Sequence, residues 1–378
     1  MRPSQQSEIQ PELDAWHMAR ALDLAVLGRG RVEPNPMVGC VIAQGAEIIG
    51  EGYHRKFGGP HAEVEALAVA GKRAAGATAY VTLEPCCHHG KTPPCTDALL
   101  AAGIARVVYA MDDPFPKVAG GGAALLRQAG IAVESGLYES SARRLNAPYL
   151  KLLQRGRPWV IAKWAMTLDG RIAAATGDSR WISGEASRAV VHELRGRCDA
   201  ILIGAGTAKA DDPQLTVRPP GLRVPLRIVV DDHAALHTAG RLVSTIAEAP
   251  LMVATSAAAP QSNIARLQAA KVEVLALTGA SRADRFAALL DELGRRRVTN
   301  LLVEGGSRVF GTLLDLGEID EVHAFIAPKL IGGAAAPAPI AGHGLAKMAD
   351  ARALDDVQWR QLGGDLYLTG RVKKQVAT

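Results

Sequence analysis

The sequence has few cysteines, few aromatic residues and no long uncharged run. Its 378 residues contain five cysteines, too few for a disulfide scaffold, and aromatic residues make up only 4%. The formal net charge is +5, and so few rings offer little base stacking, which disfavours a dedicated nucleic-acid-binding protein. The longest stretch without a charged residue, 330–346, is interrupted by glycines, prolines and a histidine, so it does not predict a membrane-spanning helix.

The remaining composition is that of a folded globular chain. Hydrophobic residues make up 48% and charged residues 21%. The N-terminal segment has no apolar core after a basic start, so no secretory signal is predicted. At ~150 residues per domain, a chain of this length is expected to form two or three domains. We therefore expect a soluble cytoplasmic protein with at least two domains.

Charge is distributed unevenly along the chain. Residues 1–150 carry 14 Lys and Arg against 15 Asp and Glu, whereas residues 151–378 carry 29 against 23. The basic surplus therefore belongs wholly to the second part, where it favours an anionic ligand.

Apolar periodicity and chain breakers predict a first domain of alternating elements. We expect a helix over 13–27 and then a hairpin of two strands, 37–43 and 48–54. Further helices are predicted over 62–74, 94–102, 120–129 and 138–153, and further strands over 78–83, 106–110 and 131–134. This alternation predicts a mostly parallel sheet covered on both faces.

A second α/β domain is predicted after the segment 155–158, which we take as the domain boundary. Apolar strands are expected over 159–165, 200–203, 226–230, 251–254, 272–275, 300–303, 321–326 and 366–370. Helices fit at 184–196, 261–270, 282–294 and 307–316. The domains therefore cover residues 1–153 and 157–378.

The densest chemistry lies in two short segments of the first domain. One is His61-Ala62-Glu63, and the other, 84–95, contains Cys86 and Cys95. One imidazole and two thiolates give three ligands, the number with which a catalytic zinc keeps its fourth position open. A proline precedes both His61 and Cys95, as at a helix start, where the helix dipole favours a thiolate. We expect His61, Cys86 and Cys95 to bind Zn²⁺, with a longer loop between the cysteines than the two residues usual in zinc nucleobase deaminases.

Glu63 is the candidate acid and base of this site. Zinc lowers the pKa of a water towards ~7, and a carboxylate two residues after the ligand His61 can carry the proton to a leaving nitrogen. A closed structural zinc site is the alternative, because Cys87, His88 or His89 could supply a fourth ligand. A purely structural site has no need of Glu63, which favours the catalytic interpretation.

Two strand ends of the second domain are rich in glycine. They are Gly204-Ala205-Gly206-Thr207 and Val303-Glu304-Gly305-Gly306-Ser307. Such ends let backbone N–H groups approach a phosphate, although each alone is more often a tight turn and the full dinucleotide fingerprint is missing. Together they favour a nucleotide-binding cleft. Lys163 interrupts the apolar strand 159–165, so its side chain either snorkels or serves a site.

Seven segments of the chain carry a resemblance to a known family: 35–39, 52–54, 61–63, 84–95, 165–171, 210–213 and 303–306. Together they resemble the bifunctional deaminase/reductases of riboflavin biosynthesis, and the resemblance covers nearly the whole chain. The long loop between Cys86 and Cys95, joined to this second domain, is specific to that family. The zinc segments alone would indicate only the wider cytidine-deaminase-like superfamily.

The resemblance implies a fold and an activity for each domain. It implies a cytidine-deaminase-like three-layer domain followed by a dihydrofolate-reductase-like α/β domain. The first would use Zn²⁺ to remove the 2-amino group of 2,5-diamino-6-ribosylamino-4(3H)-pyrimidinone 5′-phosphate by hydrolysis. The second would use NADPH to reduce the ribosyl group to ribityl. The expected partner is this small molecule, with no nucleic acid and no membrane, and the chain is expected to form a homo-oligomer.

The resemblance also implies roles for individual residues. The cofactor would be held at Ala165, Trp181, Thr207, Asp211, Gly306 and Ser307. The substrate would be held at Asn35, His54, Ser179, Arg195, Leu215, Arg218 and Glu304. The guanidinium groups of Arg195 and Arg218 suit the substrate's phosphate. Lys163 and Asp211 are candidates for proton handling during ring opening.

Two residues depart from the family's pattern. Cys87 stands where serine is more common, so either adjacent thiol could meet zinc, and we favour Cys86 because it directly follows Pro85. Asp232 replaces a serine near the cofactor. Because a carboxylate repels a phosphate, Asp232 either faces away from the cofactor or weakens the preference for NADPH.

Two other functions fit parts of the sequence. A nucleic-acid-editing deaminase would need a basic, aromatic-bearing surface around the zinc cleft, whereas residues 1–150 have a net charge of −1. A non-catalytic second domain would leave the chain with the deaminase activity alone.

Overall fold

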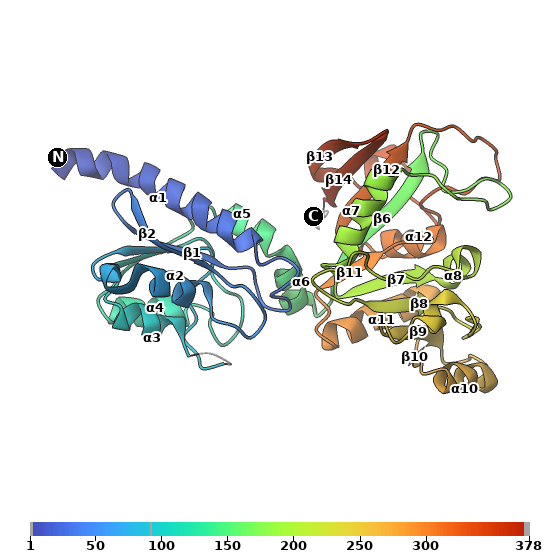
Figure 1. Ribbon diagram of the computed structural model, residues 1–378, viewed down its shortest axis with the longest axis horizontal. Coiled ribbons are helices and arrows are strands. Elements are labelled where there is room, and N and C mark those ends of the chain that lie inside the picture. Colours follow the sequence, from blue (N-terminus) through green and yellow to red (C-terminus); the bar gives the residue numbers. More distant parts are fainter. Residues whose placement is uncertain (1–2, 91–92, 374–378) are drawn as a thin grey trace. The chain divides into compact units, whose positions relative to one another are not determined.

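The computed structural model describes residues 3–90 and 93–373, with side chains from residue 10 onward. The chain divides into two compact units, Met1–Arg155 and Gly156–Thr378 (Figure 1). Among the helices described, none combines the length and apolar character needed to cross a bilayer.

The first unit is built on a five-stranded sheet with the order β2-β1-β3-β4-β5. Its strands are β1 (Gly39–Gln44), β2 (Glu47–Tyr53), β3 (Thr78–Val81), β4 (Arg106–Tyr109) and β5 (Ala132–Ser135). Strand β1 pairs antiparallel with β2 and β3, whereas β3, β4 and β5 run parallel. The prediction of a mostly parallel sheet is therefore wrong for one side of this sheet, because β1, which the tight turn to β2 makes antiparallel to β2, lies between β2 and β3 and is antiparallel to both.

Helices cover both faces of this sheet and give three layers. Helices α1 (Pro3–Val26) and α5 (Glu139–Leu145) lie on one face, and α2 (Ala62–Ala70), α3 (Cys95–Ala101) and α4 (Gly121–Gln128) lie on the other (Figure 1). A short 3₁₀ turn, Gly71–Ala74, continues α2. A Cβ atom on Gly52 of β2 would lie 2.4 Å from the carbonyl oxygen of Ala62. Only glycine therefore lets the first turn of α2 approach the sheet this closely.

The helix predicted over 138–153 is two helices, α5 and α6 (Ala147–Arg155), separated at Asn146. The buried Asn146 amide accepts a hydrogen bond from the Met37 N–H at 2.8 Å and donates to the Met37 carbonyl oxygen at 2.9 Å. These long-range hydrogen bonds fix the position of Asn146 between the two helices, and helical periodicity could not predict them.

The second unit contains a nine-stranded sheet with the order β10-β9-β8-β7-β11-β6-β12-β14-β13. The strands are β6 (Trp159–Thr167), β7 (Ala200–Gly204), β8 (Leu226–Val230), β9 (Leu251–Ser256), β10 (Glu273–Leu277), β11 (Asn300–Val303), β12 (Glu321–Ala327), β13 (Leu354–Leu362) and β14 (Asp365–Val372). The strands from β10 to β12 are parallel, and β14 and β13 add antiparallel strands at one edge.

The helices of this unit are α7 (Glu185–Arg195), α8 (Ala205–Asp211), α9 (Arg241–Ser244), α10 (Gln261–Ala269), α11 (Arg282–Arg295) and α12 (Ser307–Asp315), with a 3₁₀ turn at Met348–Asp350. Helices α8 and α9 and strand β13 were not predicted from the sequence. Most of β13 is solvent-exposed, so its side chains do not alternate between apolar and polar as those of a half-buried strand do.

The buried core of the second unit lies between the sheet and its helices. Strands β6, β7 and β11 occupy the middle of the sheet and run in the same direction. Ligands of open parallel sheets bind beyond the carboxyl ends of the strands. The loops that follow these strands therefore mark the place for a site.

Candidate functional site

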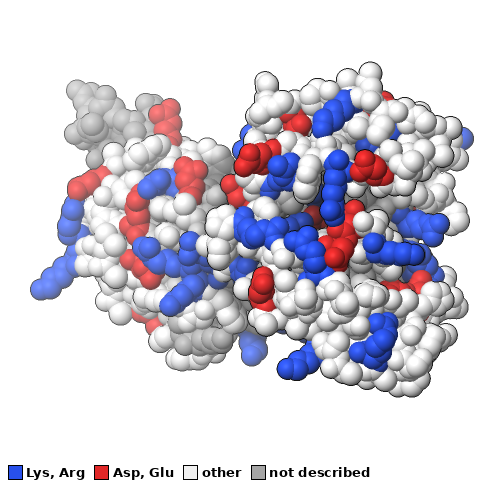
Figure 2. Space-filling model, turned by 45° about the vertical axis from the view of Figure 1, so that its right-hand side comes forward, with Lys and Arg blue, Asp and Glu red and all other residues white. Residues whose placement is uncertain are grey.

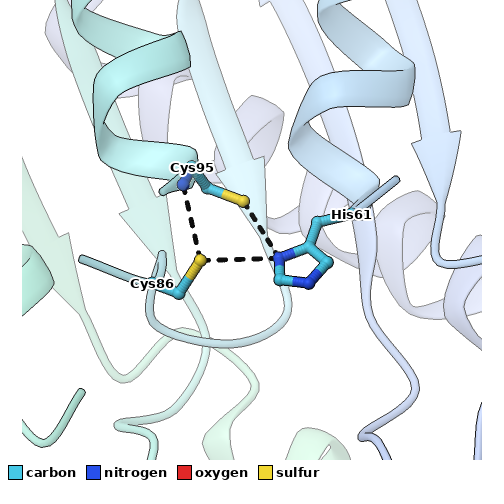
Figure 3. Close-up of side chains that lie close together, drawn as sticks. All are labelled: His61, Cys86 and Cys95. Carbon is cyan, nitrogen blue, oxygen red and sulfur yellow. Dashed lines mark hydrogen bonds between the residues drawn. The ribbon is translucent and has the colours of Figure 1, made fainter. Parts of the chain in front are cut away.

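His61, Cys86 and Cys95 form a compact cluster in the first unit (Figure 3). His61 directly precedes α2, and Cys95 is the first residue of α3. The Nδ1 atom of His61 lies 3.2 Å from Sγ of Cys95 and 3.4 Å from Sγ of Cys86 (Figure 3). The three potential ligand atoms all lie within 4.8 Å of one another.

This cluster fits a tetrahedral zinc ion. At a tetrahedral angle, Zn–N bonds of about 2.1 Å and Zn–S bonds of about 2.3 Å place the nitrogen and sulfur ligands about 3.6 Å apart. The observed separations of 3.2 and 3.4 Å are close to that value. Hydrogen bonding to Cys95 lowers the pKa of Cys86, and hydrogen bonding to Cys86 raises the pKa of His61. The donor set thus already favours a thiolate, the form that binds a metal.

A buried carboxylate outside the cluster fixes the loop that carries Cys86. The side chain of Glu84 accepts hydrogen bonds from the N–H groups of Gly120 at 2.9 Å and Ala123 at 3.1 Å, at the N-terminus of α4. A Cβ atom on Gly122 would lie 1.9 Å from the carbonyl oxygen of Pro85, so only glycine allows α4 to pack against this loop. Sequence analysis did not single out Glu84, although it begins the cysteine segment.

Glu63 lies in the first turn of α2 and is only 3% exposed. Burial raises its pKa, the negative charge of Cys86 adds to this effect, and a hydrogen bond with Cys95 opposes it. A carboxyl group whose pKa is raised in this way can hold a proton near neutral pH. The structure therefore brings Glu63 to the three ligands as a group able to accept and donate a proton.

Asn35 and His54, the two substrate contacts expected in this unit, lie beside the cluster. The His54 ring packs edge-on against the His61 ring, with their centroids 5.4 Å apart. Nδ1 of His54 lies 2.9 Å from the carbonyl oxygen of Pro60, which can only accept, so this nitrogen carries the proton. Nε2 of His54 then accepts from the Asn35 amide at 3.3 Å.

Cys87 turns away from the other two cysteines. Its Sγ lies 3.7 Å from the carbonyl oxygen of Lys117, and a Cβ atom on Gly121 would lie 3.0 Å from this sulfur. Burial raises the pKa of the Cys87 thiol. Of the two adjacent thiols, only Cys86 therefore belongs to the cluster.

The second unit contains a pocket of about 680 Å³ at the carboxyl ends of β7, β8 and β11. Five of the residues expected to bind cofactor or substrate line it: Ser179, Thr207, Asp211, Gly306 and Ser307. Both glycine-rich strand ends therefore open into one pocket. A Cβ atom on Gly306 would lie 2.9 Å from Oγ1 of Thr207, so the two ends approach each other closely.

The other six residues expected to bind cofactor or substrate in this unit do not line the pocket: Ala165, Trp181, Arg195, Leu215, Arg218 and Glu304. Lys163 does not line it either. Ala165 follows Lys163 by two residues on the same face of β6. Trp181 is 66% exposed, with the guanidinium of Arg188 4.8 Å from its ring centroid. Nζ of Lys329 donates a hydrogen bond to the carbonyl oxygen of Trp181 at 2.5 Å.

Three charged side chains form a buried cluster next to the Gly305-Gly306 turn. The carboxylate of Glu304 accepts from Nε and Nη2 of Arg195 at 2.5 and 2.9 Å, and Nζ of Lys163 lies 3.7 Å from its Oε2. Burial alone would raise the pKa of Glu304. The charges of Arg195 and Lys163 have the larger effect and lower this pKa to about 2. Burial lowers the pKa of Lys163, and Glu304 opposes that shift. Glu304 is therefore ionised at neutral pH, and Lys163 is a cation that releases its proton more readily than a surface lysine.

Asp211 connects this charged cluster to the pocket. Burial raises its pKa, whereas Arg180, the Ser179 hydroxyl and the charge of Lys163 lower it. The hydroxyl of Ser179 lies 3.5 Å from Oδ1 of Asp211, and the side chain of Arg180 donates to the Asp211 carbonyl oxygen. Asp211 and Lys163 are thus close enough to influence each other's protonation.

The loop after α8 positions Leu215 and Arg218. Leu215 is buried and has a φ of +56°. The guanidinium of Arg218 donates to Oγ1 of Thr216 at 3.1 Å, and that of Arg195 donates to the Thr216 carbonyl oxygen at 3.4 Å. The two arginines expected at the substrate phosphate are therefore linked through Thr216. Arg218 is exposed, whereas Arg195 spends two of its donors on Glu304.

Asp232 belongs to the lining of this pocket, where its effect on a bound cofactor depends on the groups around its carboxylate. It lines the pocket together with Asp231 and His233, beyond the end of β8. Arg282 and Arg308 line the same pocket, and neither was named as a site residue from the sequence. Arg308 directly follows the glycine-rich strand end 303–307, whereas Arg282 lies in no recognisable motif and reaches the end of β8 only through the packing of α11.

The basic surplus of the second unit is not gathered into one surface on the face shown in Figure 2. Lys and Arg side chains lie interspersed there with Asp and Glu side chains. A nucleic-acid-binding surface would instead require a continuous basic patch or stripe.

Comparisons with known proteins match both units to families. Residues 11–111 match the model of the cytidine and deoxycytidylate deaminase zinc-binding region, and residues 158–368 match that of the RibD C-terminal domain. The riboflavin biosynthesis protein RibD of Actinobacillus pleuropneumoniae is 42% identical over 366 residues, which cover 97% of this chain and 96% of the relative.

Solved structures agree with these matches. RibD of Acinetobacter baumannii shares 37% identity and a TM-score of 0.84, with 96% of this chain and 99% of that one covered. The diaminohydroxyphosphoribosylaminopyrimidine deaminase/5-amino-6-(5-phosphoribosylamino)uracil reductase of Thermotoga maritima also shares 37% identity, with a TM-score of 0.81 and the same coverage. The chain thus has a cytidine-deaminase-like domain followed by a reductase domain of α/β fold, as expected. It belongs to the RibD family of riboflavin biosynthesis, whose members join a zinc-dependent deaminase to an NADPH-dependent reductase.

Proposed function

We propose that the first unit removes the 2-amino group of 2,5-diamino-6-ribosylamino-4(3H)-pyrimidinone 5′-phosphate by hydrolysis, releasing ammonia. The compact arrangement of one imidazole, two thiols and a buried glutamate carries this proposal. The likeness to the Thermotoga maritima protein, a diaminohydroxyphosphoribosylaminopyrimidine deaminase, supports the substrate.

His61, Cys86 and Cys95 would hold the zinc, which supplies Lewis acidity that makes a water nucleophilic near neutral pH. Glu63 accepts a proton from that water and delivers it to the 2-amino nitrogen as the C–N bond breaks. Asn35 and His54 are hydrogen-bonded to each other beside His61, and they orient the pyrimidine ring. Asn35 keeps amide hydrogen-bonding capacity beyond the His54 contact, so it can contact a polar edge of the ring.

A substitution at Glu63 separates catalysis from metal binding. Glu63→Gln keeps the size of the side chain but cannot accept the proton, so ammonia release should fall by at least 10²-fold. Zinc content should stay at one ion per chain, because Glu63 is not among the proposed ligands. Full deamination by a variant that retains zinc would remove Glu63 from the mechanism, and loss of zinc would make Glu63 a structural residue of the site.

We propose that the second unit reduces the ribosyl group of the deaminated product to ribityl, with NADPH in the 680 Å³ pocket. NADPH supplies the hydride that C1 of the ribosyl group receives. Thr207, Asp211, Gly306 and Ser307 would hold the cofactor in that pocket, with Ala165 and Trp181 at its margin.

The charged cluster and its neighbours would hold the substrate. Ser179, Leu215 and Glu304 position the pyrimidine and the sugar, and Arg195 and Arg218 bind the phosphate. Arg218 is the better placed of the two arginines because its exposed guanidinium has donors to spare. Lys163, whose pKa burial lowers, donates the proton that the ribosyl ring oxygen takes up as its bond to C1 opens. That proton stays on the new hydroxyl group, and Asp211, which interacts electrostatically with Lys163, passes a replacement proton from solvent to Lys163.

The reductase proposal is tested with the deaminated pyrimidine as the only substrate. NADPH absorbance should fall in proportion to the substrate added, and Lys163→Met should slow this reaction without changing ammonia release by the first unit. If no NADPH is consumed with authentic deaminated substrate, the second unit has another role.

We also propose that the chain works as a cytoplasmic homo-oligomer. All five cysteines are free, which suits a reducing compartment. Strand β13 is an edge strand with exposed Val357 and Trp359, and a long exposed edge of this kind can pair with another chain. Light scattering after size-exclusion chromatography should give a multiple of 39.7 kDa, and a monomer at micromolar concentration would refute the assembly.

A further inference from the structure

The cofactor pocket carries charges of both signs where the loop after β8 meets α11 and α12. Asp232 is placed there by the end of β8, Arg282 by the first turn of α11, and Arg308 by the first turn of α12. An acidic residue in such a position usually binds the ribose 2′-hydroxyl of NADH, whereas an arginine accommodates the 2′-phosphate of NADPH. This chain contains both kinds of group in one pocket.

The carboxylate of Asp232 is already paired. Its Oδ1 accepts a hydrogen bond from Nε of Arg285 at 3.1 Å, and the Arg285 side chain is only 17% exposed. Arg285 follows Arg282 by three residues on α11, so the two side chains leave neighbouring positions of one helix face. A capping box holds this turn, because the Ser281 hydroxyl accepts from the Asp284 N–H at 3.1 Å and the Asp284 carboxylate accepts from the Ser281 N–H at 2.9 Å.

Positive charge remains after Asp232 has been neutralised. Among the described residues, neither Arg282 nor Arg308 forms an ion pair, and Nε of Arg282 donates only to the Thr312 hydroxyl, at 3.2 Å. Burial lowers the pKa of Arg282, Asp232 opposes this, and the charges of Arg308 and Arg285 lower it further. An anion between Arg282 and Arg308 would relieve that repulsion.

We propose that Arg282 and Arg308 bind the 2′-phosphate of NADPH and that the Asp232–Arg285 ion pair sets the preference for NADPH over NADH. The proposal rests on the reductase function and extends it to coenzyme choice. With Arg285 in place, the carboxylate is neutralised and the two arginines attract the phosphate. Without Arg285, the free carboxylate of Asp232 would repel the phosphate and accept a hydrogen bond from the 2′-hydroxyl of NADH.

The test measures binding rather than turnover. Isothermal titration of the zinc-loaded full chain with adenosine 2′,5′-bisphosphate and with 5′-AMP isolates the 2′-phosphate, because these probes differ in that group alone. We expect the wild type to bind the bisphosphate at least tenfold more tightly, since each charge-assisted bond to a phosphate contributes about 1.5–3 kcal/mol, which is tenfold or more in affinity. Equal affinities would overturn the proposed 2′-phosphate site.

Variants then separate the two parts of the proposal. Arg282→Met should reduce the bisphosphate preference at least fivefold. Arg285→Met should also reduce it and should raise the affinity for NADH relative to NADPH, and adding Asp232→Ser should restore the preference. Arg296→Met is the matched control: Arg296 follows the same helix, pairs with Glu292 and Glu273, and lies outside the pocket, so the preference should not change.

Three results would overturn the proposal alone, and a fourth would also contradict the reductase function. If Arg285→Met keeps the wild-type preference, the ion pair does not set coenzyme choice. If Asp232→Ser fails to restore the preference in the double variant, the loss came from Arg285 itself and not from an unmasked carboxylate. A wild type that binds NADPH and NADH equally overturns the coenzyme choice alone, whereas a wild type that binds neither contradicts the reductase function as well.

Discussion

The buried cluster of Glu304, Arg195 and Lys163 makes a quantitative prediction about the second unit. Glu304→Gln preserves the shape of the side chain and one hydrogen-bond acceptor, but it leaves two cations without their shared carboxylate. All three side chains are at most 16% exposed, so solvent cannot replace the lost charge. The substitution therefore acts on stability as well as on substrate binding.

The loss of stability can be calculated from the burial of the ion pair and, separately, from the pKa of Glu304. Removing one partner of a buried ion pair costs about 3–5 kcal/mol. The pKa of Glu304 is lowered from 4.5 to about 2, and at 1.36 kcal/mol per pH unit this difference corresponds to about 3 kcal/mol of folding free energy. Glu304→Gln should therefore lower the free energy of unfolding of the second unit by about 3 kcal/mol at pH 7.

Urea unfolding followed by tryptophan fluorescence measures this loss. Four of the five tryptophans, Trp159, Trp164, Trp181 and Trp359, belong to the second unit, so the signal reports mainly on that unit. Glu273→Gln serves as the control, because Glu273 pairs with Arg296 on the surface, where an ion pair contributes less than about 1 kcal/mol.

The pH dependence of the stability difference gives a second test of the cluster. A carboxyl group whose pKa is lowered on folding contributes its full stability above its unfolded pKa and loses that contribution as the pH falls through its folded pKa. The difference between wild type and Glu304→Gln should thus be constant above pH 5 and fall to roughly half by pH 3. A loss below about 1 kcal/mol at pH 7, or a difference that does not change with pH, would refute this account of the cluster.

Four further substitutions test the two sites. Cys86→Ser should lose bound zinc on dialysis whereas Cys87→Ser keeps one ion per chain by metal analysis, and the reverse result would exchange their roles. Gly122→Ala forces a methyl group against the Pro85 carbonyl and should destabilise the first unit by about 3 kcal/mol in thermal unfolding, and a variant of unchanged stability would contradict the packing. Gly306→Ala crowds the cofactor pocket and should raise the Kd for NADPH about tenfold by titration, whereas an unchanged Kd would place the cofactor elsewhere.

The fold was predictable where burial leaves a regular pattern in the sequence. The parallel strands of the second unit are continuous apolar runs, and each predicted strand overlaps an observed one. Strand β13 was missed because its side chains face solvent, and the break at Asn146 because its cause is a pair of bonds to Met37, over a hundred residues away. The antiparallel pair β1–β2 corresponds to the predicted hairpin. The mostly parallel sheet was predicted from the alternation of strands and helices along the rest of the first domain.

The candidate metal site was predictable because its residues lie in two short segments of the sequence. His61 and Glu63 are two residues apart, and both cysteines lie in the short segment 84–95, so spacing alone points to the chemistry. The charge environment of the cofactor pocket was not predictable in the same way. Asp232 attracted attention in the sequence, but its partner Arg285 lies 53 residues further along the chain and meets it only because α11 packs beside the end of β8.

One assay tests the central claim most directly. The full chain, loaded with zinc, is given 2,5-diamino-6-ribosylamino-4(3H)-pyrimidinone 5′-phosphate while ammonia release and NADPH oxidation are followed separately. Ammonia should appear with or without NADPH, and NADPH should be consumed one for one with the deaminated product and not before it forms. Ammonia release without any NADPH consumption, or NADPH consumption without ammonia, would contradict two consecutive reactions on one chain.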